Sequence, residues 1–184
     1  ECWENGECDS VPLPYYGLQN VDHVGGHVSY CFGQYKNWLE KEHPAIHARY
    51  SPENAYARFG RSYRMDVPPE LHYNQWIADR TADVLAQQGR GGQSGHEAAG
   101  ADKSGVSAVP LFLFCSFPDP HFPYTATRPY SEMYDPDALT LPPNWREAAD
   151  PHPYLAASRI GKWEEGVGEE ELRHIMAQTY GMIS

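Results

Sequence analysis

The stretch V-P-L-F-L-F-C-S-F at residues 109–117 is the longest apolar run in the chain, and it decides the predicted fold. The sequence Pro118-Asp119-Pro120 stops it abruptly. Apolar side chains at consecutive positions are typical of a strand that is buried on both faces, as in the interior of a parallel sheet. The run therefore predicts an α/β protein with an interior parallel strand. One strand is not a sheet, so its neighbours are expected to lie outside this chain.

Three helices are predicted around this strand. A short helix should cover residues 34–42 and end at His43-Pro44, because the residue before a proline disfavours helical conformation. A longer helix should open at Pro68-Pro69-Glu70 and end at Gly89. Its apolar face is expected to comprise Ile77, Ala78, Thr81, Ala82, Val84 and Leu85. The last helix should cover residues 169–184, with an apolar stripe of Leu172, Ile175, Met176, Thr179, Tyr180 and Ile183.

The segments between these elements are expected to be irregular. Residues 89–108 are rich in glycine, serine and alanine and predict a flexible surface loop. Residues 118–167 carry many prolines and predict a long excursion over the surface. Residues 1–33 and 44–68 show no sustained period. The fold class is therefore α/β, as a partial domain with one interior strand flanked by helices and long loops.

Composition excludes two classes of partner. The 184 residues carry a formal net charge of −11, whereas a protein that binds nucleic acid needs a basic face. No apolar run reaches the roughly 18–20 residues that cross a bilayer. Hydrophobic residues make up 41%, which is ordinary for a folded globular domain. We expect neither a nucleic-acid partner nor a membrane span.

Four cysteines are present, and structural thiols are the favoured interpretation. Cys2 and Cys8 could pair or bind a metal, but their spacing fits no common zinc signature. Cys31 is unassigned, and Cys115 is expected to be buried as a small hydrophobe within the predicted strand. The start of the chain has no signal-peptide pattern, so a cytoplasmic location is favoured over a periplasmic one.

His121 is the strongest candidate for chemistry. It comes after the predicted strand in the sequence S-F-P-D-P-H-F-P-Y, at residues 116–124. In open α/β sheets, ligands bind beyond the carboxyl ends of the strands. Prolines at 118, 120 and 123 stiffen the backbone around the histidine, whose imidazole can donate to an anionic oxygen. The alternative is a loop histidine that only caps backbone carbonyls.

Three other histidines are weaker candidates for a substrate pocket. His23 and His27 flank a glycine-rich loop, and His72 lies near a predicted helix start. A structural role is the favoured interpretation for each. Glu70-His72-Trp76 lacks the H-E-x-x-H arrangement of a zinc site. The remaining histidines are expected to face solvent: His43, His47, His96, His152 and His174.

Four stretches of the chain together resemble one protein family. Residues 116–145, SFPDPHFPYTATRPYSEMYDPDALTLPPNW, resemble the S-F-x-D-P-H-x-P-F segment of type I sulfatases and the residues that come after it in that family. Residues 15–44 are similar to the stretch that bacterial sulfatases carry after their G-K-W-H-L motif. Residues 71–85 resemble the helix before the middle strand, and residues 171–184 the helix before the family's I-D-D segment.

The resemblance implies hydrolysis of a small-molecule sulfate ester by an enzyme of the alkaline phosphatase superfamily. It also implies a formylglycine nucleophile, made from the Cys or Ser of C/S-x-P-S-R, and a divalent cation, usually calcium. Of the residues that contact sulfate in the family, only the histidine of D-P-H-x-P maps onto this chain, as His121. The nucleophile and the metal ligands have no counterpart.

Three look-alike motifs do not fill these gaps. Cys115-Ser116-Phe117-Pro118 lacks the spacing and the arginine of the nucleophile motif, and Gly161-Lys162-Trp163-Glu164 has glutamate in place of histidine. Asp22-His23 suggests a metal pair in the wrong part of the chain. Residues 1–184 are therefore expected to be an internal segment of a single sulfatase catalytic domain, inactive by itself.

Two further interpretations stay open. A phosphonate or phosphate ester hydrolase of the same superfamily would share the anion site, and this stretch of sequence does not separate sulfuryl from phosphoryl transfer. A stand-alone binding module rich in histidine and tyrosine, without chemistry, is the alternative of a different class. The organic part of the substrate is not encoded in any recognisable motif.

Overall fold

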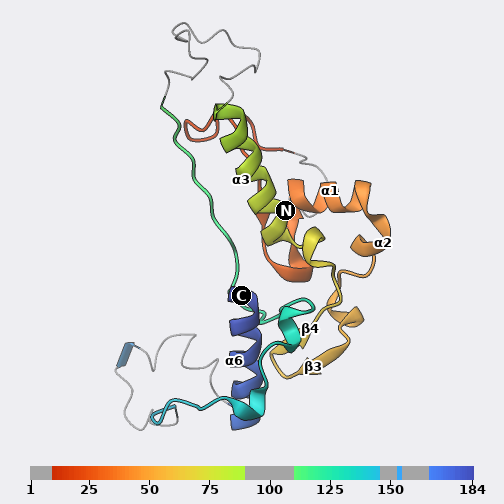
Figure 1. Ribbon diagram of the computed structural model, residues 1–184, viewed down its shortest axis with the longest axis vertical. Coiled ribbons are helices and arrows are strands. Elements are labelled where there is room, and N and C mark those ends of the chain that lie inside the picture. The colour runs from red at the N-terminus through yellow and green to blue at the C-terminus, as the bar shows by residue number, and fades with distance from the viewer. Residues whose placement is uncertain (1–9, 90–109, 146–152, 155–165) are drawn as a thin grey trace, which may run out of the picture. The chain divides into compact units, whose positions relative to one another are not determined.

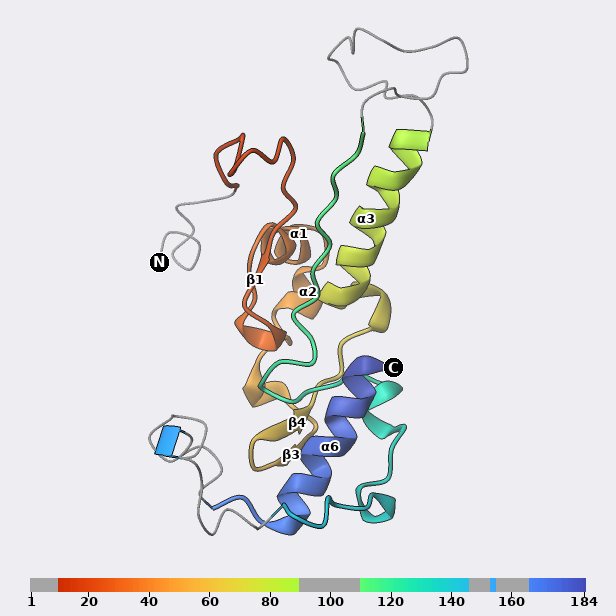
Figure 2. The same ribbon diagram turned by 90° about the vertical axis from the view of Figure 1, so that its left-hand side faces the viewer.

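The computed structural model describes residues 10–89, 110–145, 153–154 and 166–184 (Figures 1 and 2). The chain forms two compact units and passes between them more than once. The first unit is drawn from residues 1–50 and 67–119. The second is drawn from residues 51–66 and 120–184. Each unit has its own buried side chains and is described by itself.

The first unit is mainly helical. Its strands β1 (Val24–Gly25) and β2 (Phe32–Gly33) form a minimal antiparallel pair around the 3-10 turn η1 (Val28–Tyr30). The helices come next in the order α1 (Gln34–Glu42), α2 (Pro44–His47), the 3-10 turn η3 (Pro69–Leu71) and α3 (Tyr73–Gly89).

Aromatic side chains from α1 and α3 form the core of the first unit. Tyr35 and Tyr73 are completely buried, and their rings meet edge to face with centroids 6.1 Å apart. Trp76 lies 5.9 Å from the Tyr35 ring, and the Tyr35 hydroxyl donates to the Leu71 carbonyl oxygen at 2.7 Å. Large rings bury much apolar surface, while each tyrosine hydroxyl needs a partner once it is buried. This core joins the N-terminal half of α3 to α1.

Helix α1 has the predicted bounds, whereas α3 begins later than predicted. Residues 69–71 form a separate 3-10 turn, and the α-helix starts at Tyr73. The predicted apolar face of α3 is also partly wrong, because Ala82 and Leu85 are exposed and Tyr73 and Trp76 are the buried positions. Only the part of the helix that meets the aromatic core is covered.

The predicted interior strand is not formed in the described residues. Residues 110–118 are extended beside α3 in both views but have no regular secondary structure (Figures 1 and 2). Their exposure alternates: Leu111 and Leu113 are 43% and 38% exposed, whereas Phe112 and Phe114 are 78% and 73% exposed. A strand requires neighbours for its backbone N–H and C=O groups. None of the described segments pairs with this one as a strand would.

The second unit contains a hairpin within residues 44–68, which the sequence did not predict. Strands β3 (Ala57–Phe59) and β4 (Ser62–Arg64) pair antiparallel across Gly60 and Arg61. Gly60 has a φ of +56°, and a Cβ placed there would lie 2.2 Å from a carboxylate oxygen of Glu171. The absence of a side chain lets Glu171 accept from the Arg61 backbone N–H at 2.9 Å. The turn thereby fastens the hairpin to the next helix.

Helix α6 (Glu169–Ile183) is the longest helix of the second unit in the described residues and contributes four of its buried residues. The chain from residue 120 runs alongside β4, with parallel bridges from Ser62 to Tyr124 and from Met65 to Thr127, and continues through the 3-10 turns η4 (Tyr130–Glu132) and η5 (Pro136–Ala138). The first part of the predicted surface excursion is therefore integrated into the unit, because Thr125, Ala126 and Thr127 are buried.

The buried face of α6 differs from the predicted stripe. The buried residues are Ile175, Ala177, Gln178 and Gly181, while Tyr180 and Ile183 are exposed. His174, expected to face solvent, stacks on Phe59 of β3 with ring centroids 3.6 Å apart. Gln178 is on the buried face because its side chain hydrogen-bonds backbone groups of Ala126 and Ser131.

The described residues thus combine helices with two small antiparallel sheets, in accordance with a general α/β composition. No helix within the described ranges has the length and apolar character to cross a bilayer. The loop predicted at residues 89–108 lies outside the described residues, except for Gly89 at the end of α3.

The two hydrogen bonds of the buried Gln178 side chain should contribute to the stability of the second unit. Its Oε1 accepts from the Ala126 N–H at 3.2 Å, and its Nε2 donates to the Ser131 carbonyl at 2.9 Å. Gln178→Leu leaves both buried backbone groups unpaired, so the free energy of unfolding should fall by about 1–3 kcal/mol per group in urea titrations. Gln87→Leu, the same change at an exposed position of α3, is the control. Equal unfolding midpoints for the two variants would contradict the role of Gln178.

Candidate functional site

His121 lies in an exposed turn of the second unit. Its Nδ1 is 2.6 Å from the carbonyl oxygen of Phe122. A carbonyl only accepts, so Nδ1 carries the proton in this contact. The other ring nitrogen, Nε2, then has a lone pair when the imidazole is neutral and an N–H when it is protonated. The contact therefore fixes the neutral tautomer, and it is also the contact expected of the alternative interpretation, a loop histidine that caps a backbone carbonyl.

The residues after His121 are held within the second unit. Pro123 is buried, and the Tyr124 carbonyl accepts from the Tyr63 N–H at 3.3 Å. Tyr124 also forms the parallel bridge to Ser62, and its ring meets that of Phe122 edge to face at 5.9 Å. An exposed imidazole thus sits two residues before a segment that is fixed against β4.

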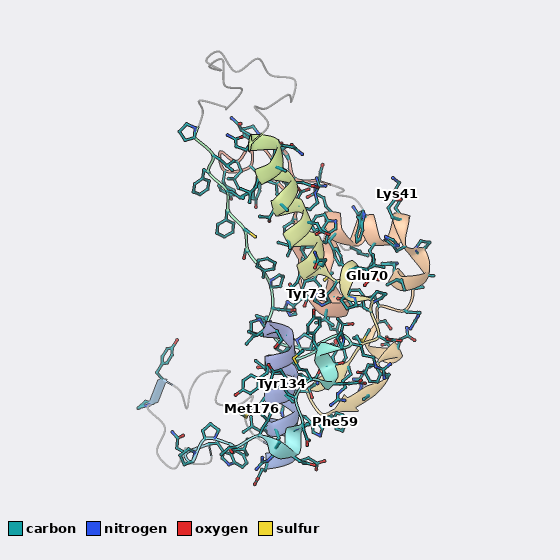
Figure 3. The ribbon with its side chains drawn as sticks, in the orientation of Figure 1. Lys41, Phe59, Glu70, Tyr73, Tyr134 and Met176 are labelled. Atoms are coloured by element: carbon teal, nitrogen blue, oxygen red, sulfur yellow. The ribbon has the colours of Figure 1, made fainter. Side chains whose placement is uncertain are left out.

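The residue two positions before His121 is held within the first unit. Asp119 accepts from the Tyr73 hydroxyl through Oδ1 and from the Asn74 side-chain amide through Oδ2, the latter at 2.8 Å. Both donors lie in the first turn of α3, and Figure 3 labels Tyr73 there. The sequence did not single out Asp119. The available signal was a carboxylate between two prolines at the end of an apolar run.

Burial dominates the electrostatics of Asp119. Desolvation raises the pKa of its carboxyl to about 6, although the hydrogen bonds from Tyr73 and Asn74 act in the opposite direction. The groups that sense its charge are Cys31, Tyr50 and Tyr73, and burial raises the pKa of each. These three side chains are therefore neutral around pH 6, and none of them supplies a compensating positive charge.

His72 has a structural role at the start of α3. Its Nδ1 accepts from the Asn74 backbone N–H at 3.3 Å, which is the bond that an N-cap side chain makes. Desolvation lowers the pKa of His72 to about 4, so the ring is neutral at physiological pH and can accept. Its ring also lies 4.0 Å from that of Tyr73. The structural interpretation is supported for this candidate.

His23 and His27 belong to the β1–β2 region of the first unit. The His23 backbone N–H donates to Gln34 at 2.8 Å, its ring meets Phe32 at 5.9 Å, and burial lowers the pKa of the imidazole. His27 precedes η1. The neighbouring Asp22 accepts from the Arg80 side chain of α3 at 3.3 Å. The Asp22 carboxylate is therefore already paired with the Arg80 side chain, which argues against a metal site formed by Asp22 and His23.

Cys31 and Cys115 lie within the described residues. Cys115 is exposed, which contradicts the expected burial, because the segment that carries it has no covering strand in the described part of the chain. Its sulfur accepts from the Thr81 hydroxyl of α3 at 3.2 Å. Cys31 is a free thiol whose pKa is raised by burial. Cys2, Cys8 and residues 161–164 lie outside the described residues.

Metal ligands do not gather within the described part of the chain. No group of three or more His, Cys, Asp or Glu side chains there is arranged to hold a cation. Glu70, His72 and Trp76 do not form such a site, since Glu70 is exposed (Figure 3) and His72 caps α3. The described residues therefore offer no ligand set for the calcium that the sulfatase resemblance implies, and that resemblance places the ligands outside this chain.

Comparison of the chain with protein-family models, with curated proteins and with solved structures yields no match. The candidate site therefore rests on the chain's own residues.

The depressed pKa of His72 predicts a pH effect on stability. Histidine has a pKa of about 6.5 in the unfolded chain, so between about pH 6.5 and 4 the unfolded state binds the extra proton, and acidification destabilises the fold. His72→Asn keeps an N-cap acceptor and removes the titrating ring. The variant should lose less unfolding free energy than the wild type between about pH 7 and 4.5.

Urea unfolding at both pH values measures this difference. The raised pKa of Asp119 acts with the opposite sign, since its stabilising contribution is lost as the pH rises from about 4 to 6. That contribution is common to wild type and variant and cancels in the comparison. Identical losses of stability on acidification in the two proteins would show that His72 is not buried in its neutral form.

Proposed function

We propose that this chain is the segment of a sulfatase that supplies one substrate-contacting histidine, His121, for hydrolysis of a small-molecule sulfate ester. The observation that carries the proposal is the sequence S-F-P-D-P-H-F-P-Y together with the exposed His121 ring and its fixed tautomer. The stretches that resemble type I sulfatases occur in the family's order, and they cover most of the described residues.

The geometry suits donation to an anionic oxygen. The Phe122 carbonyl orients the exposed His121 ring through its contact with Nδ1. A sulfate ester carries a negative charge, and the ester oxygen gains charge as its bond to sulfur breaks. An N–H donor held in place by its own backbone stabilises such developing charge with little reorganisation. His121 would therefore bind the sulfuryl group or protonate the leaving oxygen.

The formylglycine and calcium of the family have no residues to hold or generate them in this sequence, which lacks a C/S-x-P-S-R motif. In the proposed complete enzyme, other parts of the protein would supply them. What this chain would contribute is the position and the tautomer of one imidazole.

The 184-residue chain itself should not turn over sulfate esters. Incubation with an aryl sulfate should release no phenol above background, and calorimetric titration should show no tight calcium binding, because three ligands are not brought together in the described residues. A phosphonate monoester assayed in parallel tests the related hydrolase. Turnover of either ester by the purified chain would contradict the proposal.

In the complete enzyme, His121→Ala should lower kcat by about 10²–10³-fold, by analogy with the loss of one oxyanion donor. The melting temperature should change little, because His121 is exposed. His47→Ala, which removes a partly exposed histidine of α2, is the control. Wild-type kcat in the His121→Ala enzyme would show that the ring has no role in turnover.

A further inference from the structure

We propose that Asp119 is a proton-dependent latch: as a neutral carboxylic acid it attaches the extended segment of residues 110–119 to the start of α3, and ionisation loosens the attachment. The latch belongs to the first unit alone and is independent of the proposed function. Tyr73 and Asn74, in the first turn of α3, donate to the two oxygens of the Asp119 side chain. A proton on this side chain therefore acts directly on the attachment.

The extended segment and α3 match in length between two contacts. Cys115 accepts from the Thr81 hydroxyl at 3.2 Å, and Asp119 meets the helix at Tyr73. Eight residues of helix, from 81 to 73, span about 12 Å. Four residues of extended chain, from 115 to 119, span about 13 Å. The segment therefore runs antiparallel to α3, and Asp119 supplies the carboxyl group among these contacts.

The titratable groups around Asp119 offer it no positive charge. Cys31 follows η1, Tyr50 follows α2 and Tyr73 belongs to α3, and the ionised form of each would be an anion. His72 lies behind the Tyr73 ring, and desolvation lowers its pKa to about 4. In the described part of the chain, no lysine or arginine acts on the Asp119 carboxyl. A carboxylate in this place is consequently desolvated without compensation.

The neutral acid has a partner that the carboxylate cannot use. Asn74 donates to Asp119 through Nδ2, while its Oδ1 is buried and has no hydrogen-bond partner among the described residues. Rotation of this amide by 180° exchanges the two atoms, so that Oδ1 faces Asp119. A carboxylic acid can then donate its O–H to the amide oxygen and keep its other oxygen as the acceptor for Tyr73.

Ionisation of Asp119 therefore opposes the attachment. Desolvation raises the pKa of Asp119 to about 6, whereas an aspartate in the unfolded chain has a pKa of about 3.9. Between these values the folded state holds a proton that the unfolded state has lost. The stability that this proton supplies is fully present below about pH 4 and is lost as the pH rises through 6. Above that pH, the buried charge favours release of the segment from α3.

Carbon-13 NMR of the 184-residue chain measures the ionisation directly. The Asp119 carboxyl signal, assigned through its own backbone, should titrate with a midpoint of about 6. The backbone amides of residues 111–117 should become more mobile in relaxation measurements as the pH rises from about 5 to 7.5. A midpoint below about 4.5, or equal mobility of these amides at both pH values, overturns the proposal.

Asp119→Asn is the matching variant, because asparagine imitates the neutral acid. Its carbonyl oxygen can accept from Tyr73, and its amide can donate to the Asn74 oxygen. Relative to this variant, the wild type should become less stable by about tenfold in the unfolding equilibrium constant between about pH 5 and 7.5. Urea titrations measure the difference, in which the titration of His72 is common to both proteins and cancels. Asp79→Asn, the same change at an exposed position of α3, is the control and should keep the wild-type pH profile.

A latch that needs the carboxylate would give the opposite result. Asp119→Asn would then be less stable than the wild type at pH 7.5, or would not fold there, and either outcome overturns the proposal. Equal pH profiles for Asp119→Asn and the wild type overturn it as well. The NMR titration uses the wild-type chain and stays informative if the variant does not fold. None of these measurements depends on sulfatase activity.

Discussion

The burial of Tyr73 is the constraint on which the first unit depends. Its ring is completely enclosed by the aromatic core that joins α1 to α3, and its hydroxyl must find a partner because a buried donor without one is strongly destabilising. Asp119 supplies that partner. One side chain thereby joins the helix packing of the unit to the end of the extended segment that precedes His121.

His72 and His121 lie in different surroundings. His72 is buried and accepts from the first turn of α3, and desolvation lowers its pKa to about 4. His121 is exposed, and its Nδ1 donates to its neighbour's carbonyl. The first arrangement suits a neutral structural cap. The second suits a donor to an anion, which is the role proposed for it.

Local sequence determined the elements whose signals are contiguous. The bounds of α1 came from a periodic stretch closed by His43-Pro44, and α6 was located by its acidic first turn and apolar spacing. The hairpin at residues 57–64 was missed because three-residue strands are too short to show a period. His121 was identifiable from its motif, and its tautomer was not, because that depends on a carbonyl direction.

Tertiary structure decided which segments pair and which polar groups meet. Residues 110–118 are apolar and extended, but an extended chain becomes a strand only when other strands pair with its backbone. The buried face of α6 includes Gln178 because backbone groups of residues 126 and 131 lie opposite it. The hydrogen bonds from Tyr73 and Asn74 to Asp119 join residues 46 and 45 positions apart, and no local pattern encodes such a pairing. Sequence therefore determined which segments carry the candidate residues, and long-range hydrogen bonds decided how the segment that ends at Asp119 is held in the first unit.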